Sequence, residues 1–192
     1  MREILAILGA YLLGSVTFGA IIARFYGKDL RQLGSGNIGG TNVVRALGWL
    51  PGLVVTALDA LKGATAVYLA RRLGFGEWTV AACALVAVLG HSYSLFLRFR
   101  GGKGAATGLG ILLALSPWAG TYAVLVGLIP ILLTGFVSLG SLTGAISSVF
   151  FMWLTTGSVP DTLFSLIIAA TIIYRHRDNI KRLRAGQENK LF

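Results

Sequence analysis

Long apolar runs with almost no charge decide what this chain can fold into. The first run, residues 4–23, has about the length that a helix needs to cross the hydrocarbon core of a bilayer. It is too long for the core of a signal peptide, and no small-residue cleavage site follows it. Only 12% of the residues are charged, whereas about a quarter are charged in a typical soluble domain. The sequence therefore predicts an all-α integral membrane protein.

Further apolar runs predict a single polytopic membrane domain over residues 1–192, with about seven transmembrane helices. The expected spans are residues 4–23, 49–70, 77–97, 104–115, 118–134, 142–155 and 162–174. The span at 104–115 is short or broken, because its helix would rise only about 18 Å, and an interruption is expected at Pro130. The polar segments between and after the spans are approximately 24–48, 98–107, 135–141 and 175–192.

The cations are distributed unevenly over these segments. An odd number of spans puts the two termini on opposite sides, and most lysines and arginines fall in the segments that share a side with the C-terminal tail. The positive-inside rule then predicts an N-terminus outside and a cytoplasmic C-terminus. Arg71 and Arg72 run against this rule. We attribute the net charge of +10 to cations that set the membrane topology and contact anionic membrane lipids. We expect no nucleic-acid partner.

Metal and thiol chemistry are not expected. Cys83 is the only cysteine and lies in an apolar run, so a disulfide within the chain is impossible and core packing is the simplest role. The chain has two histidines, and its acidic residues do not cluster at ligand spacing. We therefore predict no metal ion and no cofactor.

Two glycine-rich segments have the composition of anion-binding loops. One contains Gly101, Gly102 and Lys103 just before a predicted helix, and the other runs over residues 34–42 and precedes Arg45. Glycine lets backbone N–H groups turn toward one point, and the start of a helix adds partial positive charge there. With the turn at 135–141 and the tail, both segments fall on the predicted cytoplasmic face. This convergence predicts a phosphate site at that face.

Several familiar catalytic patterns do not fit. The spacing of a nucleotide P-loop is missing around Lys103, and no acid is placed to orient His176 toward Ser35 in a hydrolase triad. Asp59 and Lys62 lie three residues apart on one helix face, and we favour a structural ion pair over a catalytic dyad. The remaining means of catalysis are orientation and electrostatic stabilisation.

Three stretches carry a family resemblance. They are residues 35–45 (SGNIGGTNVVR), 91–107 (HSYSLFLRFRGGKGAAT) and 174–183 (YRHRDNIKRL) with Gly186 and Glu188. In order and spacing they resemble the signature motifs of the bacterial acyl-phosphate:glycerol-3-phosphate acyltransferases, the PlsY family. The resemblance implies transfer of a fatty acyl group from acyl phosphate to the 1-hydroxyl of glycerol 3-phosphate, the first acylation of phospholipid synthesis, which yields lysophosphatidic acid. It also implies a multi-pass protein of the bacterial cell (inner) membrane with a cytoplasmic active site.

The resemblance implies roles for particular residues. Those expected to act in catalysis are Ser35, Arg45, Lys103, His176 and Asn179. Those expected to bind acyl phosphate are Ser35, Gly36, Asn37, Gly39, Gly40, Thr41, Asn42, Gly101, Gly102 and Lys103. Those expected to hold glycerol 3-phosphate are Arg45, Lys103, Ser141, His176 and Asn179, with Ser138 as a competitor for Ser141. Glu188 is expected to tie the tail to a cation, and His176 to act as a ligand rather than as a general base.

A transporter of phosphorylated metabolites is the alternative from another functional class. Such a protein also needs helix ends aimed at an anion, but it would require a polar path across the bilayer. Within the predicted spans, the charges near the centre are Asp59 and Lys62. The remaining charges gather near the membrane surfaces, which favours an enzyme working at the interface.

Overall fold

A computed structural model describes residues 1–191 as a bundle of helices, and no strand occurs within that range. The α-helices are α1 Arg2–Ser15, α2 Phe18–Phe25, α3 Gly40–Leu47, α4 Trp49–Arg72, α5 Glu77–Ser92, α6 Ala105–Leu115, α7 Pro117–Thr134, α8 Val137–Thr156, α9 Val159–Arg175 and α10 Arg177–Arg184. Two short 3₁₀ turns, η1 Leu30–Gln32 and η2 Leu95–Leu97, lie in the polar connections. The all-α prediction is confirmed.

Five helical segments are long and apolar enough to cross a membrane. They are Arg2–Phe25, Trp49–Arg72, Glu77–Leu97, Pro117–Thr134 and Val137–Thr156. Helices α6 and α9 are shorter, with 11 and 17 residues. At 1.5 Å per residue α6 rises only about 16 Å, or half of a hydrocarbon core. The short fourth helix is therefore confirmed, and the protein is a multi-pass membrane protein.

The first apolar run is not one continuous helix, contrary to the prediction for residues 4–23. Helix α1 ends at Ser15 and α2 begins at Phe18, with Val16 and Thr17 in extended conformation between them. The Lys62 ammonium donates a hydrogen bond to the Val16 carbonyl, which the break has released from the helix. A buried cation therefore satisfies a backbone acceptor that has no water within the bilayer.

Two other boundaries differ from the sequence prediction. Helix α7 runs through Pro130 to Thr134, so the expected interruption is absent from that helix. Helix α8 already begins at Val137, which leaves only Gly135 and Phe136 of the polar turn predicted at 135–141. Because of this earlier start, Ser138 and Ser141 project from the first turns of α8 instead of from a loop.

Close helix contacts depend on small residues. A side chain at Gly14 of α1 would collide with the carbonyl oxygen of Ala87 in α5, and one at Gly110 of α6 would collide with that of Ala60 in α4. Small residues let helix backbones approach where lipid supplies no hydrophobic drive for association. These contacts join α1 to α5 and α4 to α6, while α8 packs between α7 and α9.

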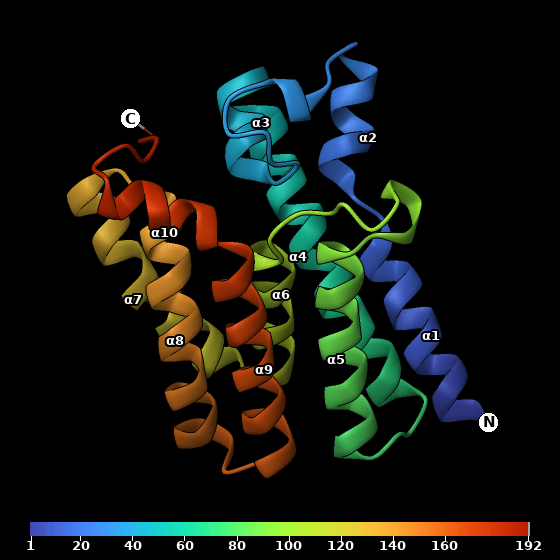
Figure 1. Cartoon of the computed structure of the whole chain (residues 1–192). Coiled ribbons are helices and arrows are strands. Elements are labelled where there is room, and N and C mark those ends of the chain that lie inside the picture. Colours follow the sequence, from blue (N-terminus) through green and yellow to red (C-terminus); the bar gives the residue numbers. More distant parts are fainter. Residues whose placement is uncertain (192) are drawn as a thin grey trace.

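The polar segments meet at one end of the bundle. Helices α2, α3 and α10 lie there with the C-terminus, and the N-terminus lies at the opposite end (Figure 1). At the far end, Arg71 of α4 donates from Nη1 to the Ala114 carbonyl at 2.6 Å and from Nη2 to the Leu115 carbonyl at 3.1 Å. Arg71 thus caps the C-terminus of the short helix α6, which explains a cation that the charge rule did not predict.

Candidate active site

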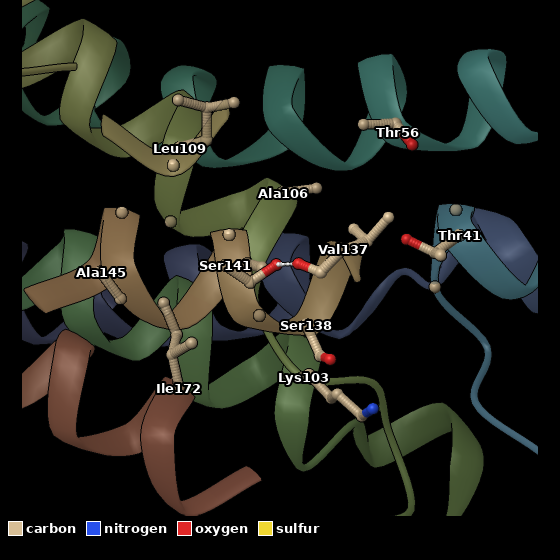
Figure 2. Close-up of a pocket in the computed structure, with 18 of the residues that line it drawn as sticks. Thr41, Thr56, Lys103, Ala106, Leu109, Val137, Ser138, Ser141, Ala145 and Ile172 are labelled. Atoms are coloured by element: carbon tan, nitrogen blue, oxygen red, sulfur yellow. Dashed lines mark hydrogen bonds between the residues drawn. The ribbon is translucent and has the colours of Figure 1, made fainter. Parts of the chain in front are cut away.

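A cavity of about 520 Å³ lies between α4 and α6 on one side and α7, α8 and α9 on the other. Its polar end is lined by residues of α3, the loop before α6, α10 and the tail. Figure 2 shows Lys103, Ser138 and Thr41 at this end, with apolar side chains such as Leu109 and Ala145 further along. Most predicted site residues line this cavity: Ser35, Asn37, Gly39, Gly40, Thr41, Asn42, Arg45, Lys103, Ser141, His176 and Asn179.

A second, smaller cavity of about 200 Å³ is lined mainly by cations and the two glycine-rich segments. Its lining residues are Ser35, Gly36, Asn37, Gly101, Lys103, Arg175, Arg177, Asp178 and Arg182. Ser35, Asn37 and Lys103 line both cavities, so the two adjoin one another there. Of the predicted site residues, Gly102 alone lines neither of them.

Lys103 joins a polar network centred on Glu188. The Lys103 ammonium donates to Asn179 Oδ1, and Asn179 Nδ2 donates to Glu188 Oε1 at 2.6 Å. The same carboxylate accepts from Ser138 Oγ at 3.1 Å and pairs with Arg182 Nε at 2.9 Å. Glu188 therefore fixes which way the Asn179 amide faces, and it ties the tail to a cation as the sequence predicted.

The electrostatics of this network favour a neutral histidine beside a titratable lysine. Burial, reinforced by Arg182, lowers the pKa of Lys103 to about 8. Burial and the nearby Lys103 lower the pKa of His176 to about 4. His176 Nδ1 lies 2.8 Å from the Ile172 carbonyl, which can only accept, so Nδ1 carries the proton. The opposite ring nitrogen, Nε2, is then left as a hydrogen-bond acceptor.

Arg45 is held by the tail. Its Nη2 donates to the carbonyls of Asn189 at 2.9 Å and Lys190 at 3.4 Å, and its buried Nε has no partner within the described chain. The tail is pinned in turn by Leu191, whose N–H donates to the Gly135 carbonyl at 2.9 Å. Burial lowers the pKa of the Arg45 guanidinium, and Glu188 opposes that effect. The unpartnered Nε gives this arginine spare capacity for an anionic ligand.

The lysine loop differs from the expected cradle of glycine N–H groups. The N–H groups of Gly101 and Gly102 donate to the carbonyls of Ser92 and His91, at 3.2 and 3.0 Å, and so are already used inside the protein. Arg175 donates to both glycine carbonyls at 3.0 Å and fixes the loop from the other side. The reason for glycine here is space, because a side chain at Gly102 would collide with His91 Nε2.

The N-terminus of α6 supplies donors that the glycines do not. Ala105 and Ala106 lie in the first turn of this helix and line the larger cavity. N–H groups in a first helical turn have no partner within their helix and carry partial positive charge. An anion beside Lys103 would therefore meet the start of α6.

In the first glycine-rich segment, Asn42 shapes the backbone. Its side-chain amide donates to the carbonyls of Leu30, Leu33 and Asn37, and its oxygen accepts from the Ser35 N–H at 2.8 Å. These bonds occupy the Asn42 side chain and hold Ser35 where the two cavities adjoin. The predicted contact of Asn42 with acyl phosphate remains a prediction.

The ion pair predicted within the second span is present and has a third member. Lys62 Nζ lies 2.7 Å from Asp59 Oδ1 and 2.9 Å from His91 Nδ1, and all three residues are buried. The pairing offsets the cost of placing charge within the bilayer. His91 was not predicted to join, because its position at the end of a different helix gave no sign of the contact.

The arginines around the smaller cavity were also missed as site residues. Arg175, Arg177 and Arg182 come from the end of α9 and from α10. Their charges are plain in the sequence of the tail, but only the turn at His176 between the two helices directs them toward Ser35 and Lys103. Among the described residues, no three His, Cys, Asp or Glu side chains lie together as a metal site would require.

Comparison with known proteins identifies the family of this chain. The family model described as Glycerol-3-phosphate acyltransferase matches residues 4–186. A glycerol-3-phosphate acyltransferase of Thermus thermophilus is 51% identical over 183 residues, which cover 95% of this chain and 92% of the relative. This chain belongs to the glycerol-3-phosphate acyltransferase family. A second member, from Aquifex aeolicus, is 44% identical over 99% of this chain and all of its own length.

Crystal structures of this family have the same fold. The glycerol 3-phosphate form of PlsY (YgiH), an integral membrane glycerol 3-phosphate acyltransferase, superposes with a TM-score of 0.95 at 44% identity, covering 99% of this chain and 96% of that one. The lysphosphatidic acid form superposes with a TM-score of 0.93 at 43% identity, covering 99% and 95%. The family resemblance inferred from the three motifs is therefore confirmed.

Proposed function

We propose that this protein transfers a fatty acyl group from acyl phosphate to the 1-hydroxyl of glycerol 3-phosphate, giving lysophosphatidic acid and inorganic phosphate. The proposal rests on one observation: a single cavity combines a polar, cationic end with a largely apolar remainder. One end is lined by Arg45, Lys103, His176 and Asn179, and most of the remaining lining is apolar. A phosphorylated polar acceptor fits the first environment, and a fatty acyl chain fits the second.

We assign the phosphate of each substrate to its own group of cationic residues. Arg45, Lys103 and Asn179 hold glycerol 3-phosphate, and Ser141 borders the same space. The phosphate of the donor occupies the smaller cavity, where Ser35 and Lys103 meet the arginines of α9 and α10. Lys103 lines both cavities and so contacts both phosphates, which brings the acyl carbon and the attacking hydroxyl together.

The chemistry follows from this arrangement. The hydroxyl oxygen bonds to the acyl carbon, and the bond from that carbon to the phosphate oxygen breaks. Phosphate leaves with the electron pair, and the hydroxyl proton passes to the departing phosphate. Orientation can supply about 7–11 kcal/mol of the lowered barrier, and donors aimed at the developing oxyanion can add about 3–4 kcal/mol. His176, with its pKa of about 4, orients the hydroxyl through a hydrogen bond at Nε2, because so weak a base gains little by removing the proton at about pH 7.

The proposal includes a membrane topology. Seven spans, with α6 and α9 added to the five long segments, leave the N-terminus outside the cell and the tail in the cytoplasm. The support is the excess of lysines and arginines in the polar segments and the tail. These segments lie at the bundle end that holds α10 and the C-terminus (Figure 1). A cysteine introduced at Lys190 should react with an impermeant thiol reagent in inverted inner-membrane vesicles and not in intact spheroplasts. Labelling in spheroplasts would reverse the topology.

The decisive experiment measures phosphate release from palmitoyl phosphate by the purified protein, with and without glycerol 3-phosphate. Release that depends on the acceptor, yields lysophosphatidic acid and is lost in Lys103→Ala is expected. Lys28→Ala is the matched control, because Lys28 is exposed and lines neither cavity. Release without acceptor would indicate a hydrolase. Uptake of glycerol 3-phosphate into sealed liposomes without any lipid product would indicate the transporter.

A further inference from the structure

The larger cavity has an open side and a closed end. Trp49 and Leu53 on α4 are each 57% exposed and Leu128 on α7 is 41% exposed, so these lining residues face the lipid. At the other extreme, the lining residues Ser148 and Ile168 are 3% and 5% exposed. A chain entering from the bilayer therefore meets a buried end wall inside the protein.

One face of α8 runs the length of this cavity. Val137, Ser141, Ala145 and Ser148 all line it, at spacings of four, four and three residues that keep them on one side of the helix. Figure 2 shows the first three in succession along α8, with Ala145 opposite Ile172 of α9. From Val137 to Ser148 the helix rises about 16 Å.

The cavity stops where this face reaches its next large side chain. Met152 lies four residues beyond Ser148, is fully buried and belongs to the packed core with Ile168 and Ala145, but it does not line the cavity. Residues four apart on a helix are neighbours on one face. On this face of α8 the cavity lining therefore ends at Ser148, and the next position one turn further on carries the larger, buried Met152 side chain.

We propose that Ser148, backed by Met152 one turn further along α8, forms the floor of the acyl-chain cavity and sets the length of fatty acyl chain that the enzyme prefers. The proposal rests on the proposed acyl transfer and adds its specificity determinants. A chain that ends at the floor buries all its methylene groups. A longer chain must overpack the closed end or leave methylene groups outside. Each methylene that loses its buried place should lower kcat/KM about fourfold, equivalent to about 0.8 kcal/mol.

The test measures kcat/KM for a homologous series of saturated acyl phosphates, from octanoyl to eicosanoyl phosphate, at one concentration of glycerol 3-phosphate. Ser148→Leu raises the floor, and the optimum should move to shorter chains by roughly two methylene groups, with a loss of about tenfold or more for the chain that wild type prefers. Met152→Ala lowers the floor, and the optimum should move to longer chains. Ser147→Leu is the matched control, since Ser147 is adjacent, half-buried and does not line the cavity.

The two variants shift the optimum in opposite directions only if the floor is where we place it. An unchanged optimum in Met152→Ala overturns the proposal even if Ser148→Leu fails to fold. Equal shifts in Ser147→Leu and Ser148→Leu overturn it as well. A wild-type protein that transfers no acyl chain of any length refutes the acyl transfer itself, which is a different outcome from a flat chain-length response.

Discussion

The alkaline pH dependence of the reaction should report the charge of Lys103. Its pKa of about 8 in the substrate-free protein means that about nine in ten molecules carry the charge at pH 7 and about one in ten at pH 9. The charged form exists below the pKa and is lost as pH rises. If the ammonium binds phosphate, kcat/KM for glycerol 3-phosphate should fall about tenfold between pH 7 and pH 9. The second ionisation of a phosphate monoester, near pH 6, is complete before this window.

The pH at which the rate falls, the alkaline limb of the profile, should depend on whether substrate is bound. A bound phosphate stabilises the ammonium and raises its pKa. The limb in kcat, which reports the complex, should therefore lie at higher pH than the limb in kcat/KM, which reports the free enzyme. Initial rates over roughly pH 6–10 at several concentrations of glycerol 3-phosphate separate the two profiles.

Two substitutions identify the group. Lys103→Arg keeps a charge that does not titrate below about pH 12, so the limb near pH 8 should disappear, whatever the rate that remains. Lys103→Met removes a charged hydrogen-bond donor worth about 1.5–3 kcal/mol, and kcat/KM should fall about 10- to 100-fold at pH 7. Lys28→Met, at an exposed lysine, should keep the wild-type profile. A limb near pH 8 that persists in Lys103→Arg would refute the assignment.

Three further predictions concern the network and the helix packing. His176→Gln should slow the reaction about tenfold without changing the profile between about pH 5.5 and 7, because a histidine with a pKa of about 4 stays neutral there; a limb near pH 6.5 that vanishes in the variant would restore the role of general base. Glu188→Gln should loosen the tail and cost about 1–3 kcal/mol, seen as a lower melting temperature and a higher KM for glycerol 3-phosphate. Gly110→Ala should destabilise the protein by about 1–3 kcal/mol, because the new side chain would collide with the Ala60 carbonyl oxygen. Gly9→Ala, where nothing lies within 4 Å, is its control, and equal melting temperatures for the two variants would contradict the packing argument.

The family and the membrane architecture could be predicted because their signals are local. A run of apolar residues predicts a buried or spanning helix whatever it packs against, and the motifs around Ser35, Lys103 and His176 are contiguous. The shortness of α6 and the pairing of Asp59 with Lys62 also follow from residue spacing within one segment. Helix boundaries were harder to predict, since α8 begins at Val137 within a stretch whose small polar residues resembled a turn.

Other features depend on contacts between segments far apart in the chain, which no local pattern encodes. The break after Ser15 is stabilised by Lys62 from another helix, and the loop at Gly101 and Gly102 is held by Arg175 at the end of α9. The hydrogen bond from Arg45 to the Asn189 carbonyl in the tail joins residues 144 positions apart. Hydrophobicity and motif chemistry belong to each segment, so a membrane protein with phosphate-binding motifs could be predicted from the sequence alone. Which donors remain free, how the tail holds Arg45 and where the apolar cavity ends emerge only in the folded protein, because hydrogen bonding and packing depend on contacts between segments.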